Sequence, residues 1–150
     1  MIKNLKGVLE DVALAKIQIE IDTNVQALLN LGESHYNFAK TIDNTEWRQK
    51  ISRLYYAAYN VRRAVSLRHD GSFSTDTSDH ANVEKVPDDF EDYAIYRSKL
   101  KNLRDDRNLA DYSHLAKDSD LLINVVDAEV LVGNYIQHAK NFLSQLGMKL

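Results

Sequence analysis

Apolar residues recur at three- and four-residue spacing along four stretches of the chain, which is the period of an amphipathic α-helix. The first stretch is 24–41, and Asp22 and Thr23 before it are candidate N-caps. The second stretch is 45–69, and Gly71 beyond its end is a typical terminator. We expect a helix over each.

Two further helices are predicted in the second half of the chain. Asp88 and Glu91, three residues apart and just after Pro87, resemble a capping box. From there a helix is expected to run to about Tyr112. The last helix is expected to begin after 118–120 and to carry an apolar stripe of Leu121, Val125, Ala128, Val132, Ile136, Ala139, Leu143 and Leu146.

The pattern is mixed at the start of the chain and absent from its longest break. In residues 2–21, Ile17, Ile19 and Ile21 alternate as in a strand, whereas the preceding apolar residues have helical spacing. We favour a helix there, because no other segment offers a strand to pair with. The break is 70–87, and a connection of this length is often functional or mobile.

Composition supports a helical fold. The chain has 150 residues but only five glycines and one proline, too few for the turns that a β-sandwich or barrel needs about every ten residues. The length fits one domain with a sizeable core. We therefore expect a single all-α domain over 1–150, with 1–22 as an N-terminal helical extension and 70–87 as a long loop.

Charge is unevenly distributed, although the net charge is only −3. Residues 46–68 carry six basic side chains against Glu46, and residues 76–92 carry seven acidic ones against Lys85. The acidic total argues against a polycation that coats nucleic acid, but a local basic face remains compatible with it. The commoner interpretation of such runs is a solvated helix face.

Missing residues and motifs exclude several classes of chemistry. The absence of cysteine excludes disulfides, thiolate zinc sites and cysteine nucleophiles, and it fits a reducing compartment. No glycine-rich phosphate loop is present, and no His, Asp and Glu residues have the spacing of metal ligands. No apolar run approaches a membrane span or a signal peptide. We expect a soluble cytoplasmic protein with no cofactor, no metal and no membrane partner.

Residues 104–114 hold the candidate chemistry. At ~100° per residue, Arg107, Asp111 and His114 fall on one helical stripe, with Arg104 close to it, if the helix persists to His114. An imidazole that titrates near neutrality serves as general acid or base, and a guanidinium binds phosphate. This set is sufficient for phosphodiester cleavage without a metal.

These residues also have structural interpretations. Arg-to-His pairs at this spacing arise by chance in a chain with eight arginines and five histidines. An exposed histidine near a helix end is also common. Asp111 either orients the imidazole of His114 or neutralises Arg107 in an ion pair.

The second helix holds the candidates for RNA binding. Tyr55, Tyr56 and Tyr59 could stack on bases beside Arg53 and Arg63, or they could pack in the core or in a dimer contact. Arg53 is either a second phosphate ligand or the partner of a carboxylate in the third helix.

Two segments and the distance between them resemble the HEPN family, in particular its small stand-alone members. The first is 52–60, Ser-Arg-Leu-Tyr-Tyr-Ala-Ala-Tyr-Asn, and the second is 107–112, Arg-Asn-Leu-Ala-Asp-Tyr. Between them, 79–82 would occupy a histidine-containing loop. The resemblance covers roughly 24–146 and implies an antiparallel four- to five-helix bundle that commonly forms a homodimer.

The resemblance also implies a function. Catalytic members of the family are metal-independent RNases that carry Arg, a polar residue, three to five further residues and then His. Arg107, Asn108 and His114 match this motif, and Asp111 and Tyr112 lie within it. His114 would transfer a proton at the RNA 2′-hydroxyl or the leaving oxygen, and Arg107 would stabilise the developing charge at a dimer-interface site. Such an endoribonuclease would be a toxin or a defence component.

Other family members lead to a different expectation. Many stand-alone members keep the arginine and the Ala-Asp-Tyr segment, lack the histidine, and are not established nucleases. The alternative is therefore a non-catalytic helical module that binds a partner protein, such as a nucleotidyltransferase-type antitoxin, or a nucleotide. A third interpretation is a scaffold dimer in which 1–22 pack across the interface.

Overall fold

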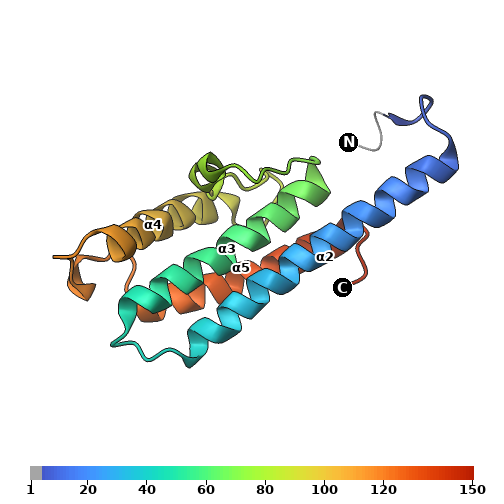
Figure 1. Cartoon of the computed structure of the whole chain (residues 1–150). Coiled ribbons are helices and arrows are strands. Elements are labelled where there is room, and N and C mark those ends of the chain that lie inside the picture. The colour runs from blue at the N-terminus through green and yellow to red at the C-terminus, as the bar shows by residue number, and fades with distance from the viewer. Residues whose placement is uncertain (1–4) are drawn as a thin grey trace.

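The computed structural model describes residues 5–150, and its long elements are all helices (Figure 1). In chain order the elements are α2 (Asp11–Thr41), α3 (Trp47–His69), the 3₁₀ turn η1 (Thr77–Asn82), α4 (Tyr93–Tyr112), the 3₁₀ turn η2 (Asp118–Asp120) and α5 (Val125–Gln145). Within the described residues no strand forms, and only an isolated bridge joins Lys6 and Leu9. The all-α prediction is therefore confirmed.

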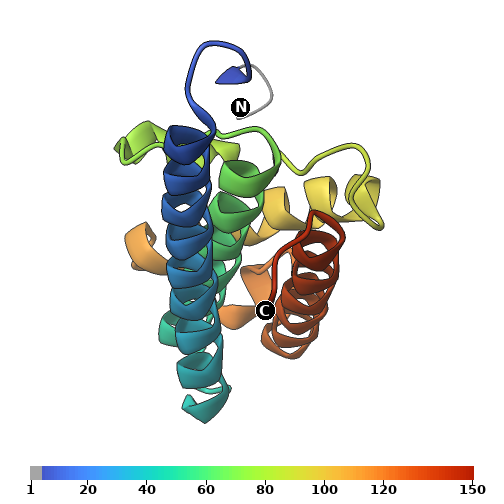
Figure 2. The ribbon, with the colours of Figure 1, turned by 90° about the vertical axis from the view of Figure 1, so that its right-hand side faces the viewer.

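The long helices form an antiparallel bundle around α3, which packs against α2, α4 and α5. The chain reverses direction between successive long helices, so α3 and α5 run in the same direction (Figure 1). Two contacts confirm this: Lys50 pairs with Glu129 near the start of both helices, and Arg68 donates to the Leu146 carbonyl near their ends. Figure 2 views the bundle with α2 and α5 on either side of α3.

The core is centred on α3 because its apolar residues face three neighbours. Ile51, Leu54, Tyr55, Val61 and Val65 are all at most 1% exposed. Burial of each such side chain contributes roughly 1.5–3 kcal/mol relative to an exposed one.

None of the described helices combines the length and apolar content that a membrane span requires.

The first helix starts much earlier than the predicted boundary at residue 24. Asp22 and Thr23 lie inside α2, and the Thr23 hydroxyl donates to the Ile19 carbonyl one turn back instead of capping. The choice of helix over strand for 2–21 is confirmed from Asp11 onward. The expected helical extension is wrong for 6–10, which form a turn with an isolated bridge, and residues 1–4 lie outside the described residues. Neither proline nor glycine interrupts the chain between Asp11 and Thr23, so the helix continues.

The predicted starts of the last two helices are also wrong by several residues. Asp88 and Glu91 form no capping box; α4 begins at Tyr93, after Asp92 adopts a left-handed conformation with φ 55°. α5 begins at Val125, because the Asn124 side chain accepts a hydrogen bond from the Asp127 N–H and caps it there.

A buried carboxylate places the start of α5 beside α4. Asp106, 1% exposed, accepts hydrogen bonds from the backbone N–H groups of Leu122 and Ile123 at 2.7 and 2.9 Å. Burial raises the pKa of Asp106, although the two N–H groups oppose this shift. The 121–124 segment is therefore fastened to α4 through its backbone, which sequence patterning does not show.

The close approach of α2 to α3 yields a stability test. A Cβ on Gly32 would lie 2.6 Å from Val61 Cγ2 and 2.9 Å from the Ala57 carbonyl oxygen, so the backbones would have to separate. We expect Gly32→Ala to lower the free energy of unfolding by about 1–3 kcal/mol in chemical denaturation.

Gly133→Ala is the matched control, since both glycines lie inside helices. A Cβ there would meet the Tyr36 hydroxyl at 2.5 Å, which is the far end of a side chain that can move. Alanine also favours a helix over glycine by about 1 kcal/mol. Equal losses of stability in the two variants would contradict the close-packing account.

Candidate functional site

Arg107 is held by three polar contacts near the end of α4. Its Nε lies 2.8 Å from Asp111 Oδ2, an ion pair without hydrogen-bond alignment. Nη2 donates to the Tyr56 hydroxyl at 2.8 Å, and Nη1 donates to Asn108 Oδ1 at 3.1 Å. A guanidinium has five N–H donors, so one N–H on each terminal nitrogen forms no hydrogen bond with residues 5–150.

Tyrosine rings surround the same guanidinium. Its central carbon lies 5.4 Å from the ring centroids of Tyr55 and Tyr56, and 5.5 Å from that of Tyr112. Tyr55 is fully buried, whereas Tyr112 is 73% exposed. Arg107 therefore lies between a packed tyrosine pair and a surface ring.

His114 does not share the helical stripe of Arg107 and Asp111. α4 ends at Tyr112, Ser113 is extended, and His114 is exposed with no hydrogen bond or ion pair to any residue in 5–150. Asp111 pairs with Arg107, which matches the second of the two interpretations of that carboxylate.

The segment that carries His114 is nevertheless fixed. Arg48 of α3 donates to the Ala110 carbonyl at 2.7 Å and to the Ala116 carbonyl at 2.6 Å. These bonds satisfy a carbonyl at the end of α4 and fasten the chain that follows it. His114 is therefore an exposed side chain on a backbone held at both sides.

Arg104, predicted beside this stripe, faces the 70–87 connection. It donates to the Ala81 carbonyl at 3.2 Å and pairs with Glu84 at 3.3 Å and with Asp105 at 3.2 Å. Arg104 thus links α4 to η1, a structural task that leaves it apart from His114.

The two arginines predicted to bind RNA differ in their surroundings. Arg53 is exposed, with its guanidinium over the Phe38 ring at 5.4 Å and 3.5 Å from His35 Nδ1. It contacts no carboxylate of α4 within the described residues. Arg63 donates to the Ser74 carbonyl and to Asn60 Oδ1, and thus holds the connection after α3.

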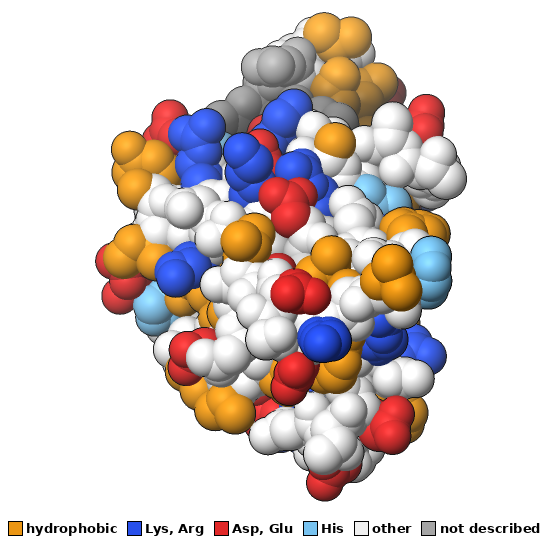
Figure 3. Space-filling view, turned by 90° about the vertical axis from the view of Figure 1, so that its left-hand side faces the viewer, with side chains coloured by type: hydrophobic (Ala, Val, Ile, Leu, Met, Phe, Trp, Pro, Cys, Tyr) orange, Lys and Arg blue, Asp and Glu red, His pale blue; other side chains and the backbone are white. Residues whose placement is uncertain are grey.

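The basic run in 46–68 does not form a free basic face. Lys50 and Arg62 are buried against Glu129 and Asp79, and Arg48, Arg63 and Arg68 bind backbone carbonyls. On the face in Figure 3, basic and acidic side chains are interspersed. Within the described residues, Arg53 is the one basic side chain of this run that binds neither a carboxylate nor a carbonyl.

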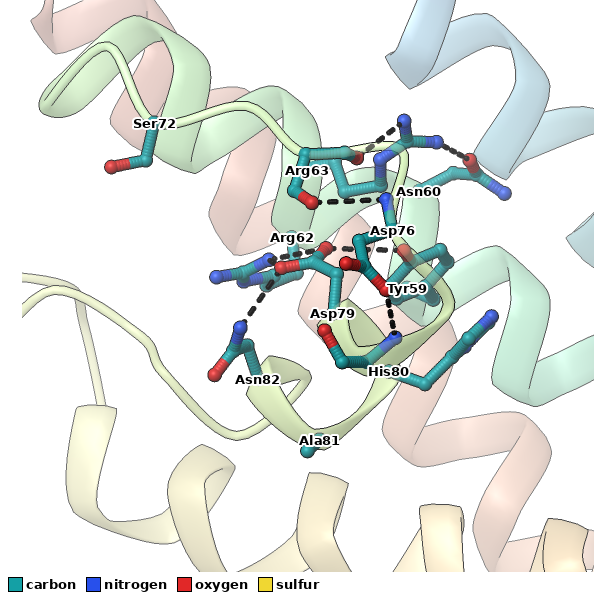
Figure 4. A network of polar contacts seen from close by, with 12 residues as sticks. Tyr59, Asn60, Arg62, Arg63, Ser72, Asp76, Asp79, His80, Ala81 and Asn82 are labelled. Carbon is teal, nitrogen blue, oxygen red and sulfur yellow. Dashed lines mark hydrogen bonds and ion pairs between the residues drawn. The ribbon is translucent and has the colours of Figure 1, made fainter.

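Asp79, 5% exposed, fastens η1 to α3 (Figure 4). Arg62 Nη1 donates to both of its oxygens at 3.1 and 3.2 Å, the Tyr59 hydroxyl donates at 3.1 Å, and Asn82 donates at 2.9 Å. These donors hold the pKa of Asp79 below its usual value although burial acts in the opposite direction. The next residue, His80, is positioned as a consequence.

Two histidines from different elements, His35 of α2 and His80 of η1, lie near the Tyr56 ring. The rings of His80 and His35 are each 5.9 Å from the Tyr56 ring. Burial lowers the pKa of both imidazoles, and Arg107 near His80 and Arg53 near His35 lower it further. We call the following residues the Tyr56 cluster: His35, Arg53, Tyr55, Tyr56, His80 and Arg107.

No sequence signal could have assembled this cluster, since its members come from α2, α3, η1 and α4. A groove of about 420 Å³ adjoins it and is lined by Arg48, Gln49, Ser52, Arg53, Tyr56, Ala110 and Asp111. The arrangement offers cationic N–H groups, neutral imidazoles and a phenol at one place. Such a set can bind an anionic ester and transfer protons.

The fold also brings together a metal-binding candidate that spacing did not indicate. The ligand atoms of Glu91, Asp92 and His138 all lie within 4.8 Å of one another. Both carboxylates are exposed, and His138 Nδ1 contacts the Tyr96 hydroxyl at 3.0 Å. Among residues 5–150 this is the one such group, and it lies apart from the Tyr56 cluster.

The chain was compared with protein-family models, with curated proteins and with solved structures, and nothing matches it in any of the three. A functional proposal therefore depends on the motifs and on the geometry of the site.

The lowered pKa values of His35 and His80 predict how the free energy of unfolding depends on pH. Because both imidazoles bind protons less readily in the fold than in the unfolded chain, the free energy of unfolding should fall as pH drops below about 6.5. Urea unfolding between pH 7.5 and about 5.5 measures this slope. The double variant His35→Gln/His80→Gln should show a clearly flatter slope. An unchanged slope would show that these histidines do not cause the pH dependence of stability.

Proposed function

We propose that this protein is a metal-independent endoribonuclease of the HEPN type that acts as a cytoplasmic homodimer and serves as a toxin or defence component. The observation that carries the proposal is Arg107, whose orientation Asp111, Tyr56 and Asn108 fix, two of these contacts being the groove-lining residues Tyr56 and Asp111. A fixed guanidinium of this kind suits the charge that develops on a phosphorane.

The reaction needs proton transfer and charge stabilisation. The RNA 2′-hydroxyl attacks the adjacent phosphorus, the P–O5′ bond breaks, and the products carry a 2′,3′-cyclic phosphate and a 5′-hydroxyl. His114, exposed near the end of α4, transfers a proton to or from a reacting oxygen. Arg107 binds the phosphorane oxygens. Arg53 and Tyr56, beside the same groove, hold the RNA strand.

Exposed apolar side chains support the dimer. Tyr112, Leu115 and Leu122 are 73%, 79% and 62% exposed around the end of α4. Large apolar side chains that are this exposed are candidates for contact with a protein partner. A second copy packed there would cover them and would bring the two Arg107-to-His114 segments into one cleft, as in the family that the motifs resemble.

The test is cleavage of single-stranded RNA by the purified protein in excess EDTA. We expect cyclic-phosphate ends, intact DNA of the same sequence, and a loss of about 100-fold or more in kcat for His114→Ala and for Arg107→Ala. His69→Ala, at the far end of α3, is the control. Intact RNA across varied sequences, or unchanged cleavage by His114→Ala, would refute the proposal.

A second candidate is the non-catalytic module that binds a partner protein, such as a nucleotidyltransferase-type antitoxin, or a nucleotide. The ion pair between Arg107 and Asp111 favours it, because a neutralised arginine often has a structural task. In this case Arg107→Ala and His114→Ala would keep partner binding in a pull-down assay. Leu115→Asp would abolish binding. The opposite pattern would exclude this candidate.

A further inference from the structure

His80 has a more defined orientation than His114. Its ring stacks on Tyr59 with centroids 4.3 Å apart and an interplanar angle of 22°. Its Nδ1 lies 2.8 Å from the Tyr55 hydroxyl, and its backbone follows Asp79, which four hydrogen bonds hold. In Figure 4 the imidazole extends away from the Asp79 network.

The Tyr55 hydroxyl contacts both Nδ1 and the carbonyl oxygen of His80, so its hydrogen bonds are linked to which ring nitrogen carries the lone pair. Burial raises the pKa of Tyr55 far above its usual value, so the phenol keeps its proton. When that O–H donates to the His80 carbonyl oxygen at 3.3 Å, the phenol oxygen accepts from Nδ1–H at 2.8 Å, and this is the tautomer that a base at Nε2 requires. Nε2 then carries the lone pair, and it contacts no polar atom within the described residues.

Arg107 lies against the same two tyrosines. His80 is 5.7 Å from the Tyr55 ring and 5.9 Å from the Tyr56 ring, while the Arg107 guanidinium is 5.4 Å from each. A proton acceptor and a cation therefore share one aromatic platform within a single chain. Arg107 also lowers the pKa of His80, so an ester bound to Arg107 would lie near His80 of the same chain.

We propose that His80 is a catalytic residue of the ribonuclease reaction, with its Nε2 as the base that accepts the proton of the attacking 2′-hydroxyl. This inference rests on the proposed function and assigns the base within it. The O2′–P bond forms as the proton passes to Nε2, the P–O5′ bond breaks, and His114 donates a proton to O5′. Exchange with water then restores both imidazoles.

The charges around His80 suit a base. From α3 it faces Tyr55, Tyr56, Tyr59 and Arg63, from η1 Asp79, and from α4 Arg107. Burial and Arg107 lower the pKa of His80, and Asp79 opposes them. The imidazole is therefore neutral at pH 7, and the acid limb of the pH–rate profile should reflect its titration.

The experiment compares kcat, KM and the pH–rate profile of four proteins on one RNA in EDTA: the native chain, His80→Gln, His80→Ala and His138→Gln. We expect His80→Gln to lose about 100-fold or more in kcat with little change in KM, and to lose the acid limb. Added imidazole should restore part of the activity of His80→Ala, which only a folded protein with a vacant base position can show.

His138→Gln is the matched control. Like His80, His138 places Nδ1 against a buried tyrosine hydroxyl, Tyr96 at 3.0 Å, but no arginine shares its platform. It should keep native activity. If the native chain cuts RNA and His80→Gln keeps full activity, the assignment of His80 is overturned and the proposed function stays intact. A native chain that cuts no RNA would overturn both.

Discussion

The buried ion pair between Arg62 and Asp79 is the interaction on which the geometry of the candidate site depends. It ties η1, in the middle of the long 70–87 connection, to the central helix of the bundle. Removal of one partner of a buried pair leaves an uncompensated charge and typically costs about 3–5 kcal/mol. This ion pair fixes the backbone of η1. The stacking of His80 on Tyr59 and the hydrogen bond from Arg104 to the Ala81 carbonyl both depend on that backbone.

Most arginines of α3 hold other segments of the fold in place. Arg48 holds the end of α4, Arg63 holds the start of the connection, and Arg68 holds the end of α5. Arg48 and Arg68 satisfy carbonyls at helix ends, and Arg63 satisfies the Ser74 carbonyl in the connection. The cations left for a ligand are therefore few, and Arg53 and Arg107 stand out because both belong to the Tyr56 cluster, beside the groove that Arg53 and Tyr56 line.

The sequence predicts those parts of the structure that arise from local periodicity. The helical stripes, the terminating Gly71 and the Arg107–Asp111 pair all follow from spacings of three to four residues along one element. The predicted helix starts are wrong because short polar residues such as Asp22 occur inside helices as well as at their N-caps.

The Tyr56 cluster could not be predicted for a different reason. His35 and His80 become neighbours of Tyr56 only when α2, η1 and α3 have packed, and no periodicity within one segment encodes that meeting. The same reason applies to Asp106, whose partners Leu122 and Ile123 lie in the next connection. Chemistry built from several elements is visible only in the fold.

The central claim is that Arg107, His80 and His114 belong to one phosphodiester site. NMR titration of the histidine ring signals with uridine 3′-monophosphate tests it most directly, because binding is observed without turnover. We expect the signals of His80 and His114 to shift with one common dissociation constant, those of His138 to stay constant, and all shifts to vanish in Arg107→Ala. Shifts that persist without Arg107, or that leave His80 and His114 unaffected, would contradict the account.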